Sequence, residues 1–354
     1  MTSDDVKERR MRCYGHILNL TARAFLFGED QETFEAESDF YQLVDRHEED
    51  LRLWRKVGAV GRLRNIVKFT RASPQRSERF RKASSEVDDH EDYQISTRSR
   101  SESRLILNNE TRWNSTYLMI NRAIEKKGEL QTFLVSIGDD DDPSHHVPEA
   151  DLLSPEDWKV LAEIRHLLEP FYLQTKRTEG WGKADGHGRL WEVTVGMEYL
   201  LAHLLEWKSY YNSEVIPLDR TIDFTEENAS QPSQGRGGRS RRRTAATQSL
   251  QQRFDETTLP LHVRMDWGDH SPRSISRFGS LDDKYQQHLR SSIEQAWQKL
   301  FHYYCRLGES PLFAASIILH PSLGYSYLED IWNAEHQVSW RLNAKEGMVE
   351  YFNK

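Results

Sequence analysis

The chain has 354 residues, of which 29% are charged, and its formal net charge is -8. This length allows two or three domains, and without an apolar run near 18 residues the sequence excludes a membrane-spanning protein. Its two cysteines, Cys13 and Cys305, are too few for a disulfide framework and indicate a reducing, intracellular compartment.

The first predicted element is a helix over residues 13–27, which begins with a CxxH pair, Cys13 and His16. The pair could be half of a metal site, but a structural zinc ion needs about four ligands and no second pair follows at ligand spacing. A buried helix is the alternative that the sequence favours, because free cysteine behaves as a small hydrophobe. The inner face of that helix is predicted to hold Cys13, Ile17, Leu20, Ala24 and Phe27.

Residues 62–82 form a basic segment with eight lysines and arginines against one acid, Glu78. Such a segment can neutralise DNA phosphates, and the serine and asparagine side chains within it can donate to phosphate oxygens. The alternative is a solvated helical face followed by a basic tail, since charge runs often have no binding role. The predicted DNA contacts here are Arg76, Arg79, Arg81 and Lys82.

Further along the chain the periodicity is mostly helical. Ser154 and Pro155 are typical of a helix start, with serine as the N-cap and proline at the first position. Apolar residues repeat at helical spacing after this point, over 190–205 and over 285–304, where Ser280 is the predicted cap. The strand signals are 104–108 and 314–320. The chain is therefore predicted to be mainly α.

Three polar stretches cannot offset their ordering entropy by apolar burial and are predicted to be irregular: residues 84–102, 138–151 and 212–276. The last contains five arginines among glycines and serines over 236–243. This Arg-rich tract could be a nuclear-import signal or a non-specific DNA tether. A flexible linker with neither role is the alternative.

Five blocks of the chain, in this order, resemble successive blocks of the hAT-superfamily transposases, in particular the fungal group. The resemblance implies a ribonuclease H-like core interrupted by a large helical insertion domain, with metal-assisted cutting and joining of DNA as the family's chemistry. We therefore expect a mainly α fold with a partial α/β element, the remnant of such a core. The blocks are "RCYGHILNLTARAFLFG" at 12–28, residues 58–80, "NNETRWNSTYLMINRAI" at 108–124, residues 167–180 and residues 296–332.

This resemblance and the composition together divide the chain into five segments. The first is a core remnant with the CxxH helix and the basic segment, and the second is a disordered linker. The third is a strand with a helical insertion region, the fourth a disordered Arg-rich loop, and the fifth the C-terminal helical region of the core. Their expected bounds are 1–83, 84–103, 104–211, 212–276 and 277–354.

Ribonuclease H-like transposases hold two divalent metal ions with three acidic side chains. The family pattern implies two aspartates upstream of the CxxH block and a glutamate in the C-terminal segment. Twelve residues precede Cys13, and Lys354 ends the chain soon after 311–332, while Asp4 and Asp5 have no strand to fix them. We therefore expect a catalytically inactive protein, truncated at both ends, with no catalytic residue, metal ligand or cofactor. Mg²⁺ is expected only for an intact homologue.

Arg112 and Trp113 resemble the Arg-Trp pair of the family, whose tryptophan supports an unstacked base or a hairpin end. An indole can stack on a flipped base while a guanidinium holds its phosphate. The alternative is a tryptophan that anchors the following helix in the core, because tryptophan is commonly buried.

The sequence thus predicts a nuclear, transposase-derived protein with weak, salt-dependent DNA binding. Self-association is expected from exposed apolar surface, because a core without its first strands would leave the helix at 13–27 uncovered. No membrane and no small-molecule substrate is expected as a partner. The alternative function is a helical protein-interaction scaffold with no DNA role.

Overall fold

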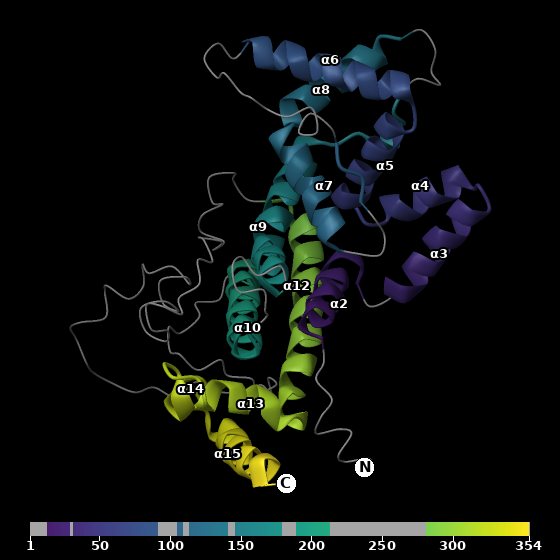
Figure 1. The fold of residues 1–354 in the computed structure, drawn as a ribbon. Coiled ribbons are helices and arrows are strands. Elements are labelled where there is room, and N and C mark those ends of the chain that lie inside the picture. Colours follow the sequence, from purple (N-terminus) through teal and green to yellow (C-terminus); the bar gives the residue numbers. More distant parts are fainter. Residues whose placement is uncertain are drawn as a thin grey trace, which may run out of the picture. The chain divides into compact units, whose positions relative to one another are not determined.

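The computed structural model describes residues 13–28, 31–90, 105–108, 113–140, 146–178, 189–212 and 281–353. Their regular secondary structure is helical, and no strand occurs in these ranges (Figure 1). The mainly α prediction is confirmed. By contacts the chain divides into two compact units, which are residues 1–18, 173–274 and 297–354 (unit 1) and residues 19–172 and 275–296 (unit 2).

The two predicted strands are absent, which corrects the expectation of a partial α/β element for these segments. Residues 314–320 lie largely in helix α13 (Pro311–Ile318), because Ser310 takes the N-cap position and Pro311 the first turn, where its fixed φ suits a helix. Residues 105–108 have no regular secondary structure. A single segment without a partner strand forms no sheet.

Helix α2 (Tyr14–Phe27) confirms the helix predicted for residues 13–27, and Ile17 and Ala24 of its predicted inner face are buried. Leu18, Ala22 and Phe25 are buried, whereas Cys13 and His16 are exposed. Cys13 precedes the first turn, so it does not share the face that the later apolar residues form. The CxxH pair is therefore not part of the core.

In unit 2, α3 (Gln31–Leu43), α4 (His47–Arg55) and α5 (Ala59–Arg71) follow one another in the chain. Phe27, Phe34 and Trp54 join α2, α3 and α4 through ring centroids 5.1–5.8 Å apart. Gly58, with φ 72°, makes the turn between α4 and α5. Gly61 lets α5 approach α4, because a methyl group there would overlap the Trp54 carbonyl.

The next helices of unit 2 are α6 (Pro74–His90), α7 (Trp113–Glu125) and α8 (Lys127–Gly138). Phe80 and Phe133 pack edge to face with centroids 5.7 Å apart, which joins α6 to α8. Helix α6 includes residues 84–90, which were predicted as linker, so that prediction is wrong for this part. The helix continues because residues 84–90 contain neither glycine nor proline to end it. The remaining linker residues, 91–103, lie outside the described residues.

Helix α9 (Pro155–Thr178) begins at the predicted residue. The Ser154 Oγ accepts from the Asp157 amide at 3.1 Å, and the Asp157 carboxylate accepts from the Ser154 amide at 2.9 Å. This reciprocal pair satisfies two amides at the helix start. Helix α12 (Asp283–Cys305) confirms the helix predicted over 285–304, although the predicted cap, Ser280, lies outside the described residues.

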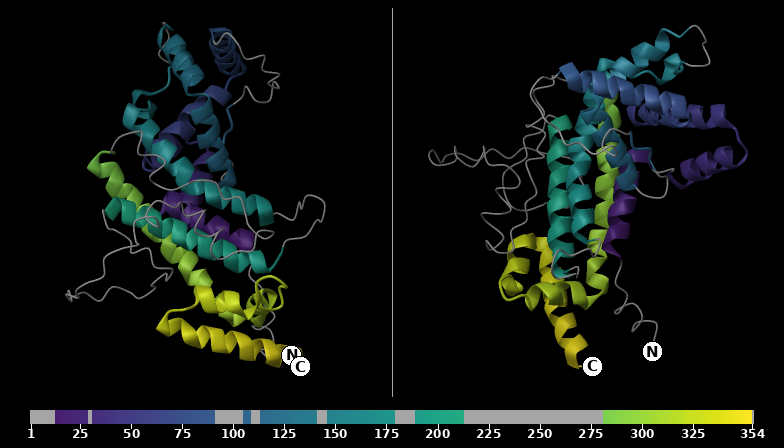
Figure 2. Two further views of the ribbon diagram at one scale, coloured as in Figure 1. Left: turned by 90° about the vertical axis from the view of Figure 1, so that its left-hand side faces the viewer. Right: turned by 45° about the horizontal axis from the view of Figure 1, so that its top comes forward.

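Unit 1 contains α10 (Trp191–Asn212), which confirms the helix predicted over 190–205 and is buried along most of its length. Around its middle, Gly196 allows close packing, since a methyl group there would overlap Gln174 and Tyr14. The C-terminal part of this unit has α13, α14 (Gly324–Ile331) and α15 (Val338–Asn353), with α13 packed on both α14 and α15 (Figure 2). Short 3₁₀ helices precede α13 and α15: η7 (Leu307–Glu309) and η8 (Glu335–Gln337).

Unit 1 also buries a carboxyl group that faces two hydrogen-bond donors rather than a cation. The Tyr304 hydroxyl donates to Glu198, and the Trp332 indole N–H donates to the Tyr304 hydroxyl. Burial raises the pKa of Glu198 to about 8. Glu198 therefore ties α10 to α12 mainly as a neutral acid near pH 7.

Among the described helices, none is long and apolar enough to cross a membrane. The Arg-rich tract at 236–243 and the rest of 213–280 lie outside the described residues. The predictions for that segment stay predictions.

Candidate nucleic-acid interface

The basic segment 62–82 is divided between two helices with different surroundings. Its first half lies in α5, where Arg64 is 3% exposed and donates to the Asp50 carboxylate at 2.6 Å. Lys68 donates to the same carboxylate at 2.8 Å, and Ser38 donates at 2.9 Å. Burial alone would raise the pKa of Asp50, but Arg64 and Lys68 hold it below its ordinary value. Arg64 therefore belongs to the core of unit 2, and Lys68 reaches the same buried acid from its edge.

One further carboxylate neutralises a cation just before the start of α5. Asp151, which is buried, accepts from Arg55 at 2.8 and 2.7 Å in the bidentate geometry typical of strong arginine pairs. Asn65 also donates to Asp151, at 2.8 Å. The prediction that residues 138–151 form only an irregular loop is therefore wrong at its end, because these contacts order the short helix η2 (Glu149–Asp151).

The second half of the basic segment lies in α6, where the cations reach solvent. Arg79 is 49% exposed and pairs with Asp140 at 3.0 Å, and Arg81 is 55% exposed and pairs with Glu78. Lys82 is exposed, and Arg76 is half-buried over the Phe69 ring, 3.8 Å from its centroid. Exposed ion pairs of this kind are weak and exchange partners readily. These arginines are therefore available to an external phosphate.

A hollow of about 420 Å³ lies beside α6 and brings Arg81 together with Arg71, which the sequence analysis did not select. Arg71 is exposed and donates to the Leu105 carbonyl at 3.2 Å. Ser77, also at this hollow, donates to the Thr70 carbonyl at 3.1 Å. Arg71 is the last residue of α5, at the turn into α6. The only sequence signal for a DNA contact at Arg71 was its place within the basic segment 62–82.

The structure corrects the predicted role of Trp113. It is 3% exposed, its ring packs 6.2 Å from that of Tyr117, and its amide N–H donates to Asn19. A base can stack on an indole only where a ring face is open. The alternative, a tryptophan that anchors α7, fits this position. Arg112 lies outside the described residues.

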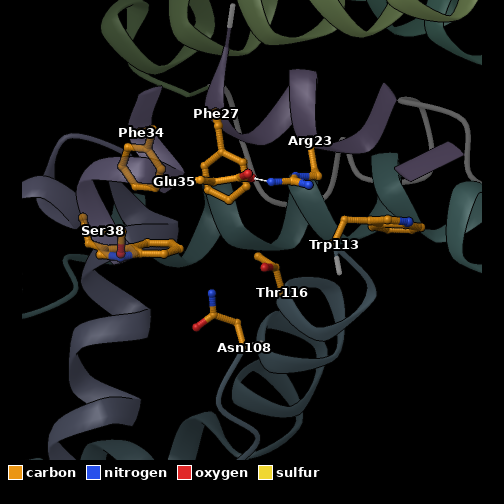
Figure 3. A pocket seen from close by; sticks show the side chains of 9 residues that line it. Arg23, Phe27, Phe34, Glu35, Ser38, Asn108, Trp113 and Thr116 are labelled. Carbon is orange, nitrogen blue, oxygen red and sulfur yellow. Dashed lines mark hydrogen bonds and ion pairs between the residues drawn. The ribbon is translucent and has the colours of Figure 1, made fainter. Parts of the chain in front are cut away.

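Trp113 also lines a small apolar cavity with the aromatic cluster of α2–α4 (Figure 3). An ion pair between Arg23 and Glu35 closes one side, and the two side-chain polar atoms of Asn108 are buried there without a hydrogen-bond partner in the described chain. The cavity has a volume of about 10 Å³. That volume holds about one water molecule, which could satisfy Asn108, and excludes a nucleobase.

No three histidine, cysteine, aspartate or glutamate side chains of the described ranges are grouped as metal ligands. Cys13 and His16 are both exposed at the start of α2. The expectation of an inactive protein is not tested by this observation and stays a prediction.

Comparison with known proteins finds similarity in the first part of the chain. Residues 11–167 match the family model of the ZBED1 RNase-like helical domain. The zinc finger BED domain-containing protein RICESLEEPER 2 of Oryza sativa subsp. japonica is 26% identical over 162 residues. This alignment covers 46% of the chain and 16% of that relative. No solved structure matches the chain.

The family match spans α2 to α9, which includes the buried ion pairs of α5 and the exposed cations of α6. It agrees with the resemblance seen in the sequence blocks at 12–28, 58–80 and 108–124. Residues 11–167 are therefore similar to the ZBED1 RNase-like helical domain, and the chain spans only a small part of the relative that it matches.

Proposed function

We propose that this protein derives from a hAT-family transposase and binds the DNA backbone through the exposed cations of α6, with little sequence preference. The observation that supports this proposal is the contrast within the basic segment. Arg64 and Lys68 of α5 pair with the buried Asp50, whereas Arg79 and Arg81 of α6 are about half exposed and pair with Asp140 and Glu78. Phosphates can displace such exposed carboxylates, because released counterions favour the exchange.

Phosphate contacts position a protein on DNA but carry no sequence information. Trp113 is buried and offers no open ring face to a base, so we expect duplex and hairpin DNA to bind alike. We also propose a nuclear location, where the Arg-rich tract at 236–243 would add a second, non-specific contact to DNA. The net charge of -8 restricts binding to such local patches.

Fluorescence anisotropy of a labelled 20-base-pair duplex at low salt tests the proposal. Replacing Arg76, Arg79 and Arg81 with alanine should weaken binding at least tenfold, since each arginine supplies a phosphate contact. Arg52→Ala is the matched control, because Arg52 is an exposed arginine of the same unit that pairs with Glu48. Equal affinities of the triple variant and the control would contradict the proposal, as would no binding by the unmodified chain.

A second candidate function is protein interaction, supported by an apolar stripe on α15. Val338, Leu342, Val349 and Phe352 share one helix face and are 37–63% exposed, while Ala344 on another face is buried. Exposed stripes of this kind mark protein contacts. We propose that the stripe supports self-association, and analytical ultracentrifugation should show the weight-average mass fall when Leu342 and Phe352 are replaced by glutamine. An unchanged mass would refute it.

A further inference from the structure

A second group of cations in unit 2 surrounds a hollow of about 220 Å³ that is separate from the α6 surface. Residues of the turn between α4 and α5, of α9 and of the start of α12 line this hollow. Residues that are far apart in the chain meet here. The basic side chains that line it are Arg55, Lys56, Arg62, Lys284 and His288.

Two of these cations are already paired. Arg55 is held by Asp151, and Arg62 donates to Asp157, which also accepts from the Tyr285 hydroxyl at 2.9 Å. These contacts fix the two guanidinium groups and leave little net charge on each pair. The Nε–H of Arg62 remains buried without an acceptor among the described residues. The Arg62 guanidinium is therefore a fixed group at one wall, held by Asp157.

The other three groups have no acidic partner. Lys56, Lys284 and His288 are exposed at the mouth, and within the described chain none of them takes part in an ion pair or side-chain hydrogen bond. Asp282 and Asp283 precede Lys284 in the sequence but do not line the hollow. Burial lowers the pKa of His288, so its imidazole is mainly neutral near pH 7. The excess positive charge of the hollow therefore comes from Lys56 and Lys284, over an apolar floor that includes Val160 and Ile164.

Clefts lined by one sign of charge over a low-dielectric surface concentrate counterions of the opposite sign. Lysine is a common phosphate ligand as a point charge, and arginine and histidine add directed donors. The start of α5 at Gly58 and Ala59 adds the positive end of a helix to the same wall. We propose that this hollow binds a phosphate group, with Lys56, Lys284 and His288 as its ligands and the fixed guanidinium of Arg62 at one wall.

The phosphate could belong to a nucleic-acid backbone or to a small phosphorylated molecule. ³¹P NMR with inorganic phosphate tests phosphate binding, which both sources share. Addition of the chain at constant ionic strength should broaden the phosphate signal, and the broadening should saturate as the site fills. Replacing both Lys56 and Lys284 with glutamine should reduce the phosphate affinity about tenfold or more, because both charges at the mouth are lost. Lys56→Arg with Lys284→Arg should retain binding.

Arg52→Gln provides the matched control, since Arg52 lies on α4 outside the hollow and pairs with Glu48. Circular dichroism should show unchanged helix content in every variant, as the two lysines are exposed. The proposal is overturned if the unmodified chain does not broaden the signal, or if the double glutamine variant binds phosphate as tightly as the control.

Anisotropy with the duplex distinguishes the two sources. If the site takes a nucleic-acid phosphate, the double glutamine variant should also bind DNA less tightly, and inorganic phosphate should compete with DNA. If it takes a small molecule, DNA binding should be unchanged in the same variant. The triple alanine variant of α6 should still bind inorganic phosphate, so failure of the DNA proposal would leave this site standing.

Discussion

Helices α5 and α6 carry similar positive charge in adjacent sequence, yet they use it in opposite ways. On α5, Arg64 and Lys68 meet the buried carboxylate of Asp50, which accepts at 2.6 and 2.8 Å. On α6, Arg79 and Arg81 stand about half exposed beside solvated acids. This difference shows that a basic run in a sequence need not form one continuous surface, because only its exposed half can contact a partner.

The largest effect on stability should come from removing the buried acid that pairs with the cations of α5. Asp50→Ala leaves Arg64 and Lys68 without their acceptor, and removing one partner of a buried pair costs about 3–5 kcal/mol. Urea unfolding measures this loss. Glu78→Ala, which removes an exposed acid from α6, should leave the midpoint of unfolding unchanged. Equal midpoints for the two variants would show that the α5 pairs do not stabilise the fold.

The contacts of Asp50 with Arg64 and Lys68 should also determine how stability changes at acid pH. Since the pKa of Asp50 is lowered in the folded protein, its contribution is complete above the ordinary value near 4 and is lost as the pH falls through the lowered value. Thermal unfolding from pH 5 to pH 2 should therefore show a steep fall for the unmodified chain. Asp50→Asn should have a shallower dependence, and parallel curves would contradict this explanation.

A buried carboxyl group without a cation should behave in the opposite way. The pKa of Glu198 is about 8 when folded, so the folded state binds the proton more tightly than the unfolded state. Stability should fall as the pH rises from about 4.5 to 8, by on the order of 3 kcal/mol between pH 5 and pH 8. Glu198→Gln should remove most of this dependence in chemical unfolding, and an unchanged slope would refute it.

The smallest effect should come from the ion pair that links α6 to α8. Asp140→Asn frees the half-exposed Arg79, and such pairs contribute about 0–1 kcal/mol to stability. DNA affinity should rise about twofold, because Arg79 no longer has to leave a carboxylate before it binds a phosphate. Anisotropy at low salt measures this rise, and weaker binding would show that Asp140 positions Arg79 for DNA.

Sequence periodicity and caps were sufficient to predict most helices. The Ser154–Pro155 start was placed at the right residue because its signals are local, and they remain visible without knowledge of the fold. The strand at 314–320 was predicted wrongly, since a short apolar run fits a strand and a buried helix equally well, and the helix start at Ser310–Pro311 decided between them.

The candidate sites depended on contacts that no local pattern contains. Asp50 and Asp157 pair with cations of the basic segment, and Asp151 pairs with Arg55 just before it. Asp151 and Asp157 lie more than 80 residues from these partners in the chain. The hollow with Lys56 and Lys284 joins segments 228 residues apart for the same reason, as their numbers show. The sequence left two roles open for Trp113, base stacking and anchoring a helix in the core, and only its burial distinguishes them.

The salt dependence of DNA binding tests the central claim most directly. The logarithm of the affinity should fall linearly with the logarithm of salt concentration, with a slope of about -0.9 for each phosphate contact. Replacing Arg76, Arg79 and Arg81 with alanine should make the slope shallower by up to about 3 units, while Lys68→Gln on α5 should leave it unchanged. Equal slopes for the α6 triple variant and the unmodified chain, or a shallower slope for Lys68→Gln alone, would contradict the assignment of DNA binding to α6.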